Sequence, residues 1–86
     1  MADINVKFIH PTDGRELTVT LDDSITGQEA VAELISASFI EPDSQGYSLA
    51  IKGGNQIRPN ATFSESGVKE PDQNTIRVVP ATDAGN

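Results

Sequence analysis

The sequence predicts an α+β fold in which one amphipathic helix crosses a mixed sheet of four to five strands. Three observations lead to this prediction. Several short stretches alternate between apolar and polar residues, which is typical of half-buried strands. One longer stretch has a helix-capping motif followed by apolar residues at three- and four-residue spacing. Turn-forming residues separate these stretches, and we expect one domain over residues 1–79 and a flexible tail over residues 80–86.

The N-terminal part of the chain predicts a β-hairpin. Residues 4–8 and residues 17–21 each alternate apolar with polar side chains. Between them, Asp13 can accept a hydrogen bond from a nearby backbone amide, and Gly14 can adopt the left-handed conformation that a short loop requires. We therefore expect two antiparallel strands joined at residues 11–14.

The single helix is predicted to begin at Gly27. Thr26 and Glu29 have the spacing of a capping box, in which each side chain accepts a hydrogen bond from the backbone amide of the other. We expect the helix to end near Ala37 or Ser38. The apolar residues that we expect to face the sheet are Val31, Leu34, Ile35 and Ala37.

The C-terminal half predicts three further strands of unequal length. Residues 47–51 alternate and stop at a glycine-rich turn, and a short segment follows around Ile57. The stretch 62–68 has the composition of a compact turn, and we expect its Phe and Val side chains to enter the core. Residues 75–79 form the final strand, with its isoleucine and first valine on one face.

The composition argues against several classes of function. The net charge of −7, from 13 acidic and 6 basic residues, disfavours binding to nucleic acid or anionic membranes and favours basic partners. No cysteine is present, which argues against thiolate chemistry, and we expect a cytoplasmic protein. His10 is the only histidine and has no partner at matched spacing, so we expect a turn residue, with no metal, no cofactor and no enzyme activity.

The predicted order of elements is hairpin, helix, strand, short strand, turn and strand, which is the order of the β-grasp fold. The C-terminal half resembles the corresponding run of ubiquitin in the order and spacing of short motifs. A second likeness, to bacterial ubiquitin-like domains, covers residues 25–29 and 52–54. The motifs similar to ubiquitin are Leu49-Ala-Ile-Lys-Gly53, Ile57, Thr62-Phe63, Ser66-Gly-Val68 and Thr75-Ile-Arg-Val-Val79.

The resemblance to ubiquitin implies a role for the end of the sequence. When the final strands are matched, Gly85 falls where ubiquitin has its terminal glycine, and Asn86 is an extension that a peptidase would remove. Ala84 replaces the penultimate glycine of ubiquitin but is also slim. The chain would then be a protein modifier served by a processing peptidase, an activating enzyme and a conjugating enzyme. Sulfur carriers of this fold usually end in two glycines, so Ala84 and Asn86 disfavour that variant.

The resemblance also points to a surface. Ala50, Arg77 and Val79 match the outward positions through which ubiquitin contacts its receptors, but Ala50 is small and Arg77 is charged. This difference leaves two interpretations of the three residues: ordinary sheet surface, or a partner-binding surface with altered specificity. The second hypothesis for the whole chain is accordingly a monomeric, non-conjugated adaptor that acts by docking to proteins.

Overall fold

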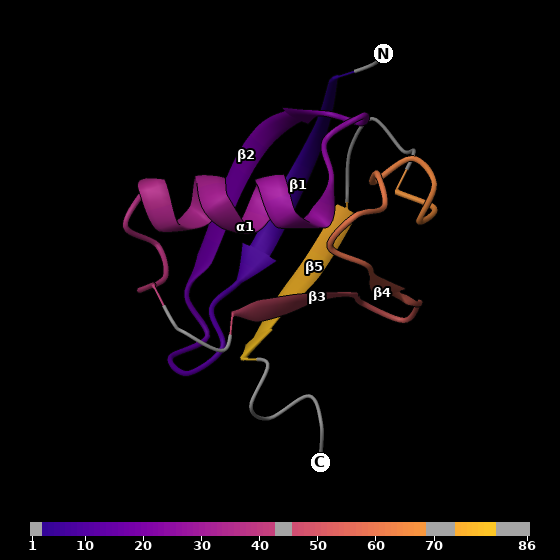
Figure 1. Cartoon of the computed structure of the whole chain (residues 1–86). Coiled ribbons are helices and arrows are strands. Elements are labelled where there is room, and N and C mark those ends of the chain that lie inside the picture. Colours follow the sequence, from indigo (N-terminus) through magenta and orange to yellow (C-terminus); the bar gives the residue numbers. More distant parts are fainter. Residues whose placement is uncertain (1–2, 43–45, 69–73, 81–86) are drawn as a thin grey trace.

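The computed structural model describes residues 3–42, 46–68 and 74–80. Within them, one helix lies across one face of a five-stranded sheet, so the predicted fold class is confirmed (Figure 1). The elements in chain order are β1 (Asp3–Ile9), β2 (Glu16–Asp22), α1 (Gly27–Ser36), β3 (Tyr47–Ile51), β4 (Gln56–Ile57) and β5 (Asn74–Pro80).

The sheet has the strand order β2-β1-β5-β3-β4 and is mixed. β1 pairs with β2 in the predicted antiparallel hairpin, and β3 pairs antiparallel with both β4 and β5. The one parallel pair joins β1 to β5, with Phe8 opposite Ile76. Strands from the two ends of the sequence therefore form the centre of the sheet.

The local motifs of the hairpin and the helix start are confirmed. Gly14 has a φ of 75°, and the Arg15 amide donates to the Asp13 carboxylate at 2.9 Å. At the helix start, the Thr26 amide donates to Glu29 Oε1 at 3.0 Å and the Glu29 amide donates to Thr26 Oγ1 at 3.2 Å. These bonds satisfy backbone amides that have no partner inside a helix.

The apolar stripe of α1 differs from the prediction at one position. Leu34 is buried, Val31 and Ile35 are half-buried, but Ala37 is exposed because the helix ends at Ser36. Beyond this end the chain turns through Ser38, at a φ of 61°, and continues into the buried Phe39. The residue that completes the buried face is Ala30, which the sequence reasoning left out.

A close approach fixes the start of α1 against the loop after β4. The Gly27 amide donates to the Ala61 carbonyl at 3.1 Å, and the Gln28 amide donates to the Pro59 carbonyl at 2.9 Å. A Cβ at Gly27 would lie 2.6 Å from the carbonyl oxygen of Arg58. Glycine is therefore required by contact between two backbones, rather than by a special dihedral angle.

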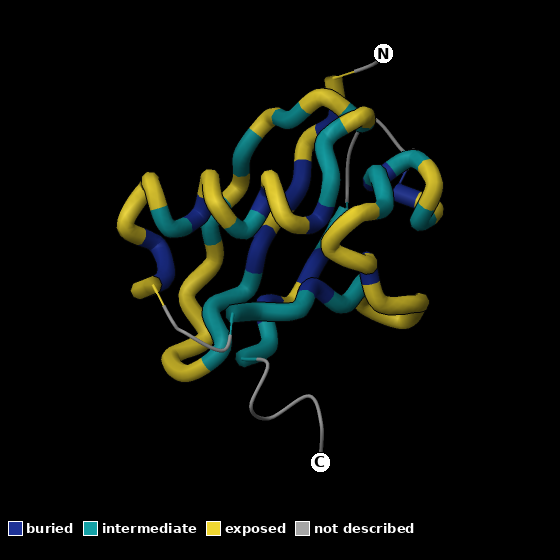
Figure 2. The backbone as a smooth tube through the Cα atoms, viewed as in Figure 1, coloured by how far each residue is buried: buried dark blue, intermediate teal, exposed yellow. Residues whose placement is uncertain are grey.

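The core lies between α1 and the sheet, and the predicted turn 62–68 closes one end of it (Figure 2). Phe63 and Val68 are buried as expected, and the Phe63 ring packs against Phe8 at a centroid distance of 6.5 Å. No polar or charged residue is buried among the described residues. The buried core residues are Ile4, Val6, Phe8, Ala30, Leu34, Phe39, Ile40, Leu49, Ile57, Phe63, Val68, Ile76 and Val78.

The turn 62–68 contains a second capping box. The Thr62 amide donates to Glu65 Oε1 at 2.9 Å, and the Glu65 amide donates to Thr62 Oγ1 at 3.0 Å. As at the helix start, a Thr is followed three residues later by a Glu in the sequence. Here the motif closes a single turn that is not a helix. The hydrogen bond from the Thr62 amide also lowers the pKa of the Glu65 carboxyl from its ordinary value of 4.5.

Candidate protein-interaction surface

The sheet face that points away from α1 carries mostly polar side chains, and we call it the outer face. Side chains alternate along each strand, so neighbours of the buried core positions point outward. One row of this face crosses the whole sheet through register partners. Its residues are Glu16, Ile9, Arg77, Ala50 and Gln56, from β2 to β4 in order across the sheet.

The structure brings the three predicted surface residues together on the outer face. Ala50 is the register partner of Arg77 across β3 and β5, and Val79 follows Arg77 on the same strand and the same face. Arg77 is exposed, while Ala50 and Val79 are half-buried. Because its neighbours Ala50 and Val79 are smaller apolar residues, the Arg77 side chain remains exposed.

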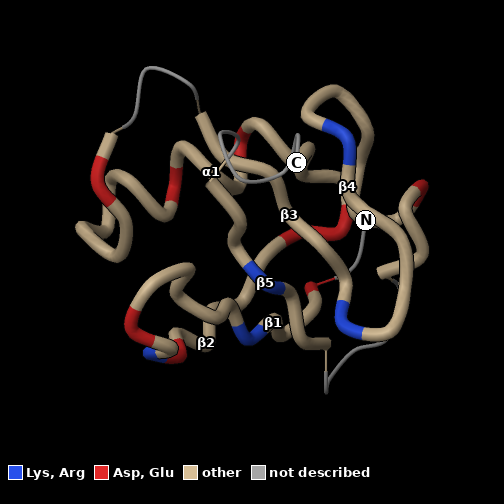
Figure 3. The backbone as a smooth tube through the Cα atoms, turned by 90° about the horizontal axis from the view of Figure 1, so that it is seen from below, with Lys and Arg blue, Asp and Glu red and all other residues tan. Residues whose placement is uncertain are grey.

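Two further cations lie beside Arg77 and were not included in the predicted surface. Lys7 is the register partner of Thr75 across β1 and β5, and the Lys52 amide donates to the Thr75 carbonyl at 2.9 Å from the end of β3. Lys7, Lys52 and Arg77 therefore surround Thr75, and we call these three residues the basic triad. Figure 3 shows basic segments on β1, on β5 and just after β3. The alternation of side chains along each strand predicts that these residues lie on the outer face. It does not predict which strands are adjacent in the sheet.

The predicted turn residue His10 is more enclosed than expected, with a side chain only 14% exposed. Its ring meets the edge of the Phe39 ring at a centroid distance of 5.4 Å. The Arg15 guanidinium lies over the same ring, at 5.6 Å, and its Nε donates to Asp13 at 2.8 Å. The pKa of the Asp13 carboxyl is lowered, first because it accepts the Arg15 amide and further by the positive charge of Arg15. These contacts connect the hairpin loop between β1 and β2 to Phe39, in the segment that follows α1.

No group of three or more residues of the types His, Cys, Asp and Glu could hold a metal ion within the described ranges 3–42, 46–68 and 74–80. His10 in particular uses Nδ1 within its own loop, where the Thr12 and Asp13 amides approach at 3.2 and 3.3 Å.

Solved structures with the same arrangement come from several kinds of protein. The UBL domain of Plasmodium falciparum Dsk2 matches with a TM-score of 0.67 and 25% identity, over 90% of this chain and 96% of that one. The ubiquitin-like domain of an Arabidopsis thaliana protein matches with a TM-score of 0.70 and 16% identity, over 94% and 80%. The chain has the ubiquitin-like β-grasp fold. A chain from a structure that concerns molecular mimicry of SUMO, a mimicry that promotes DNA repair, also matches, with a TM-score of 0.71 and 14% identity, over 92% of each chain.

The ubiquitin-like fold is thus recognised through structure, since no family model and no curated protein matches the sequence. Ubiquitin-like domains generally act through contacts with other proteins and are generally not enzymes, which agrees with the polar outer face described above. No helix in the described part of the chain is long and apolar enough to cross a membrane.

The predicted tail begins at the end of β5, beside a surface hollow of this ubiquitin-like fold. Pro80 is the last residue of β5 and is the register partner of Tyr47 at the start of β3. A surface hollow of about 510 Å³ adjoins this point, lined by Pro80, Tyr47 and the His10 cluster among others. Ala84, Gly85 and Asn86 lie outside the described residues, so their proposed processing remains a prediction.

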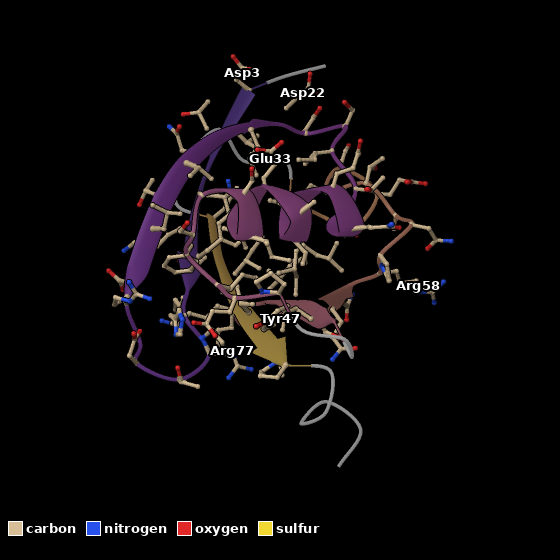
Figure 4. All side chains as sticks on the ribbon, turned by 60° about the vertical axis from the view of Figure 1, so that its left-hand side comes forward. Asp3, Asp22, Glu33, Tyr47, Arg58 and Arg77 are labelled. Atoms are coloured by element: carbon tan, nitrogen blue, oxygen red, sulfur yellow. The ribbon has the colours of Figure 1, made fainter. Side chains whose placement is uncertain are left out.

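Two acidic side chains lie at the end of the sheet that is far from Arg77. Asp3 and Asp22 are register partners at the far ends of β1 and β2. Figure 4 shows these two residues at one end of the molecule and Arg77 near the other end. Among the described residues of the outer face, three cations therefore lie around Thr75, with Glu16 beside one of them, Lys7.

Proposed function

We propose that this ubiquitin-like protein is a protein modifier that is conjugated through Gly85. A peptidase would hydrolyse the Gly85–Asn86 bond and release the glycine carboxylate. An activating enzyme would adenylate this carboxylate with ATP, and a conjugating enzyme would carry it as a thioester. A target amine would then displace the thiol and form an amide bond. The protein itself supplies the electrophilic end and a recognition surface, but no catalytic group.

The observation that carries this proposal is the position of Gly85 relative to the fold. β5 ends at Pro80, and Gly85 is the fifth residue after this end. An extended segment of that length spans up to about 17 Å, which is enough to pass the glycine into a narrow active-site channel while the domain stays outside. Ala84 and Gly85 have little or no side chain to obstruct such a channel.

The net charge suggests how the enzymes would recognise the domain. A chain with a net charge of −7 is attracted to a basic surface, and this attraction speeds association at low ionic strength. Salt screens such long-range attraction over a Debye length of about 10 Å at 0.1 M. We therefore expect the activating enzyme to present a basic patch, and activation to slow as the salt concentration rises.

A comparison of variants in the native cells tests the proposal. An N-terminally tagged chain should form heavier covalent species, and Gly85→Asp should abolish them, because a charged side chain blocks both cleavage and activation. Asp83→Asn is the matched control and should keep them, since it leaves the Ala84-Gly85 end intact. If the Gly85→Asp chain forms the same adducts as the unaltered chain, conjugation through this glycine is excluded.

The second candidate function is a non-conjugated adaptor that docks through the outer face. The specific observation in its favour is the exposed Arg77 beside Ala50, because this pair cannot present the apolar patch expected of a ubiquitin-like receptor surface. In this case, Gly85→Asp should keep full cellular activity and Arg77→Glu should lose it. The opposite result would favour the modifier.

A further inference from the structure

The distances between the three residues of the basic triad can be compared with the distances between carboxylates in an extended peptide. Lys7 and Lys52 flank Thr75 on two sides, so their backbones are two strand spacings apart, or about 10 Å. Arg77 is two residues along β5 from Thr75, which places it about 7–8 Å from each lysine along the diagonals of the sheet. Carboxylates at alternate positions of an extended peptide are about 6.6–7 Å apart. The spacing between Arg77 and each lysine therefore matches that of two successive carboxylates within the reach of flexible side chains.

The charges of the basic triad are available to a partner. Arg77 and Lys52 are exposed, and neither forms an ion pair with another described residue. Lys7 lies 3.8 Å from Glu16, but the two side chains are 45% and 56% exposed. An exposed pair at that distance contributes little and is easily exchanged for another carboxylate.

We infer that the outer face binds an extended acidic segment of a partner protein, whose alternate Asp or Glu side chains pair with the basic triad. This inference deepens the docking role of the second proposed function and rests on it. Arg77 forms the centre of the site because its guanidinium can hold a carboxylate through two parallel hydrogen bonds. Ala50 and Ile9 lie on either side of Arg77 and provide a low apolar floor, so the partner backbone can approach closely.

The overall charge of the chain favours a short acidic segment over a long polyanion. Nucleic acids and anionic membranes extend beyond the basic triad and would meet Asp3 and Asp22 at the far end of the sheet. A short peptide that stays within about a Debye length of the basic triad avoids most of that repulsion. Because salt screens the attraction between the acidic segment and the basic triad, the affinity for this segment should fall as salt is added.

Titration of the full chain with a blocked peptide in which Glu alternates with Ser tests the inference. Nuclear magnetic resonance should show shifts of the backbone amides of Lys7, Thr75 and Arg77, and the same peptide with Gln in place of Glu should cause none. Arg77→Gln should weaken binding about fivefold, since it removes a charged contact at an exposed site. Its side chain is exposed, so the fold should be unaffected.

Arg58→Gln is the matched control. It removes the same charge from an exposed arginine that follows β4, two strands away from β5 (Figure 4). We expect its effect on affinity to be clearly smaller than that of Arg77→Gln. Equal effects of the two variants would mean that only net charge matters, and would overturn the inference.

Three other results would also overturn it. Equal binding of the Gln peptide would assign the surface to neutral ligands. Shifts of the triad amides caused by single-stranded DNA, at the affinity of the peptide, would assign it to polyanions. Shifts that grow with protein concentration in the absence of peptide would make a second copy of the chain the occupant.

The titration is independent of the modifier proposal, because it involves no cleavage or conjugation. If the peptide binds and Gly85→Asp leaves the cellular adducts unchanged, the modifier proposal fails and the docking surface stands. If the peptide does not bind and the adducts depend on Gly85, the inference fails and the modifier proposal stands.

Discussion

At the scale of single residues, Gly27 shows how backbone contact can override helix propensity. Alanine is favoured over glycine within helices by up to about 1 kcal/mol. At Gly27, however, an added Cβ would lie 2.6 Å from a backbone carbonyl oxygen that is held by the loop after β4. Backbone cannot move aside as a flexible side chain can, so α1 or the loop must shift.

We therefore predict that Gly27→Ala destabilises the protein. Overpacking costs about 1–3 kcal/mol, which should exceed the propensity gain and lower the free energy of unfolding by about 1 kcal/mol or more. Urea unfolding measures this change. Gln28→Ala is the control, because Gln28 is the next residue of the same turn and is exposed, and it should change stability by less than about 0.5 kcal/mol. A Gly27→Ala chain as stable as the original would show that the close approach is wrong.

The resemblance to ubiquitin predicted part of the candidate surface. Ala50, Arg77 and Val79 were reached through the resemblance to ubiquitin, and the structure places them side by side. Lys7 and Lys52 were recognisable only as exposed lysines, because their closeness to Arg77 depends on which strands are neighbours.

At the scale of elements, the helix illustrates which local signals were sufficient. The capping box predicted the start of α1 correctly, because this motif requires a specific pair of hydrogen bonds at the first turn. The end was less certain, because Ser38 adopts the left-handed conformation that is more usual for glycine. Ala37 was consequently assigned to the buried face, although it is exposed, and Ala30 was left out although it is buried.

Leu34 should make the largest single contribution of α1 to stability. Its side chain is only 2% exposed, so Leu34→Ala leaves a cavity and should cost about 2–5 kcal/mol of unfolding free energy. Ala37→Ser, at an exposed position, should change it by less than about 0.5 kcal/mol. Chemical denaturation of both variants would test the helix register, which would be wrong if the two costs were similar.

At the scale of the whole molecule, the order of strands could not be derived from local patterns. Alternation predicted each strand, but the central parallel pair joins β1 to β5 across most of the sequence. Such a pairing is decided by how all the apolar faces can be buried together, and no short window contains that information. The resemblance to ubiquitin predicted the β-grasp fold with a mixed sheet, and the strand order comes from the structure.

Stability should depend on pH through three exposed carboxylates, Asp13, Asp22 and Glu65. Each has a lowered pKa, mainly because it accepts a backbone amide, from Arg15, Ser24 and Thr62 respectively. A carboxyl whose pKa is lower in the folded state contributes its stability above its unfolded pKa, and the contribution disappears as the pH falls. The ordinary values are 3.8 for Asp and 4.5 for Glu, so the melting temperature should begin to fall near pH 4.5 and continue below 3.8.

Glu65→Gln provides the test of this pH dependence. Gln can still accept the Thr62 amide but cannot be protonated, so the melting temperature of this variant should fall less between neutral and acidic pH. Glu33→Gln removes an exposed carboxylate that makes no hydrogen bond to the described residues, and its profile should follow that of the unaltered chain. Identical profiles for all three chains would contradict the assignment of this stability to Glu65.

The central claim, that this ubiquitin-like protein is a modifier, depends on Gly85. The most direct test is the intact mass of the protein recovered from cells that express it natively, together with the masses of any heavier species. A modifier should be recovered as a chain that ends at Gly85, or as a remnant ending Asp83-Ala84-Gly85 on a lysine of another protein. A single species that retains the Gly85–Asn86 bond, without any heavier adduct, would show that the protein is not a modifier of this kind.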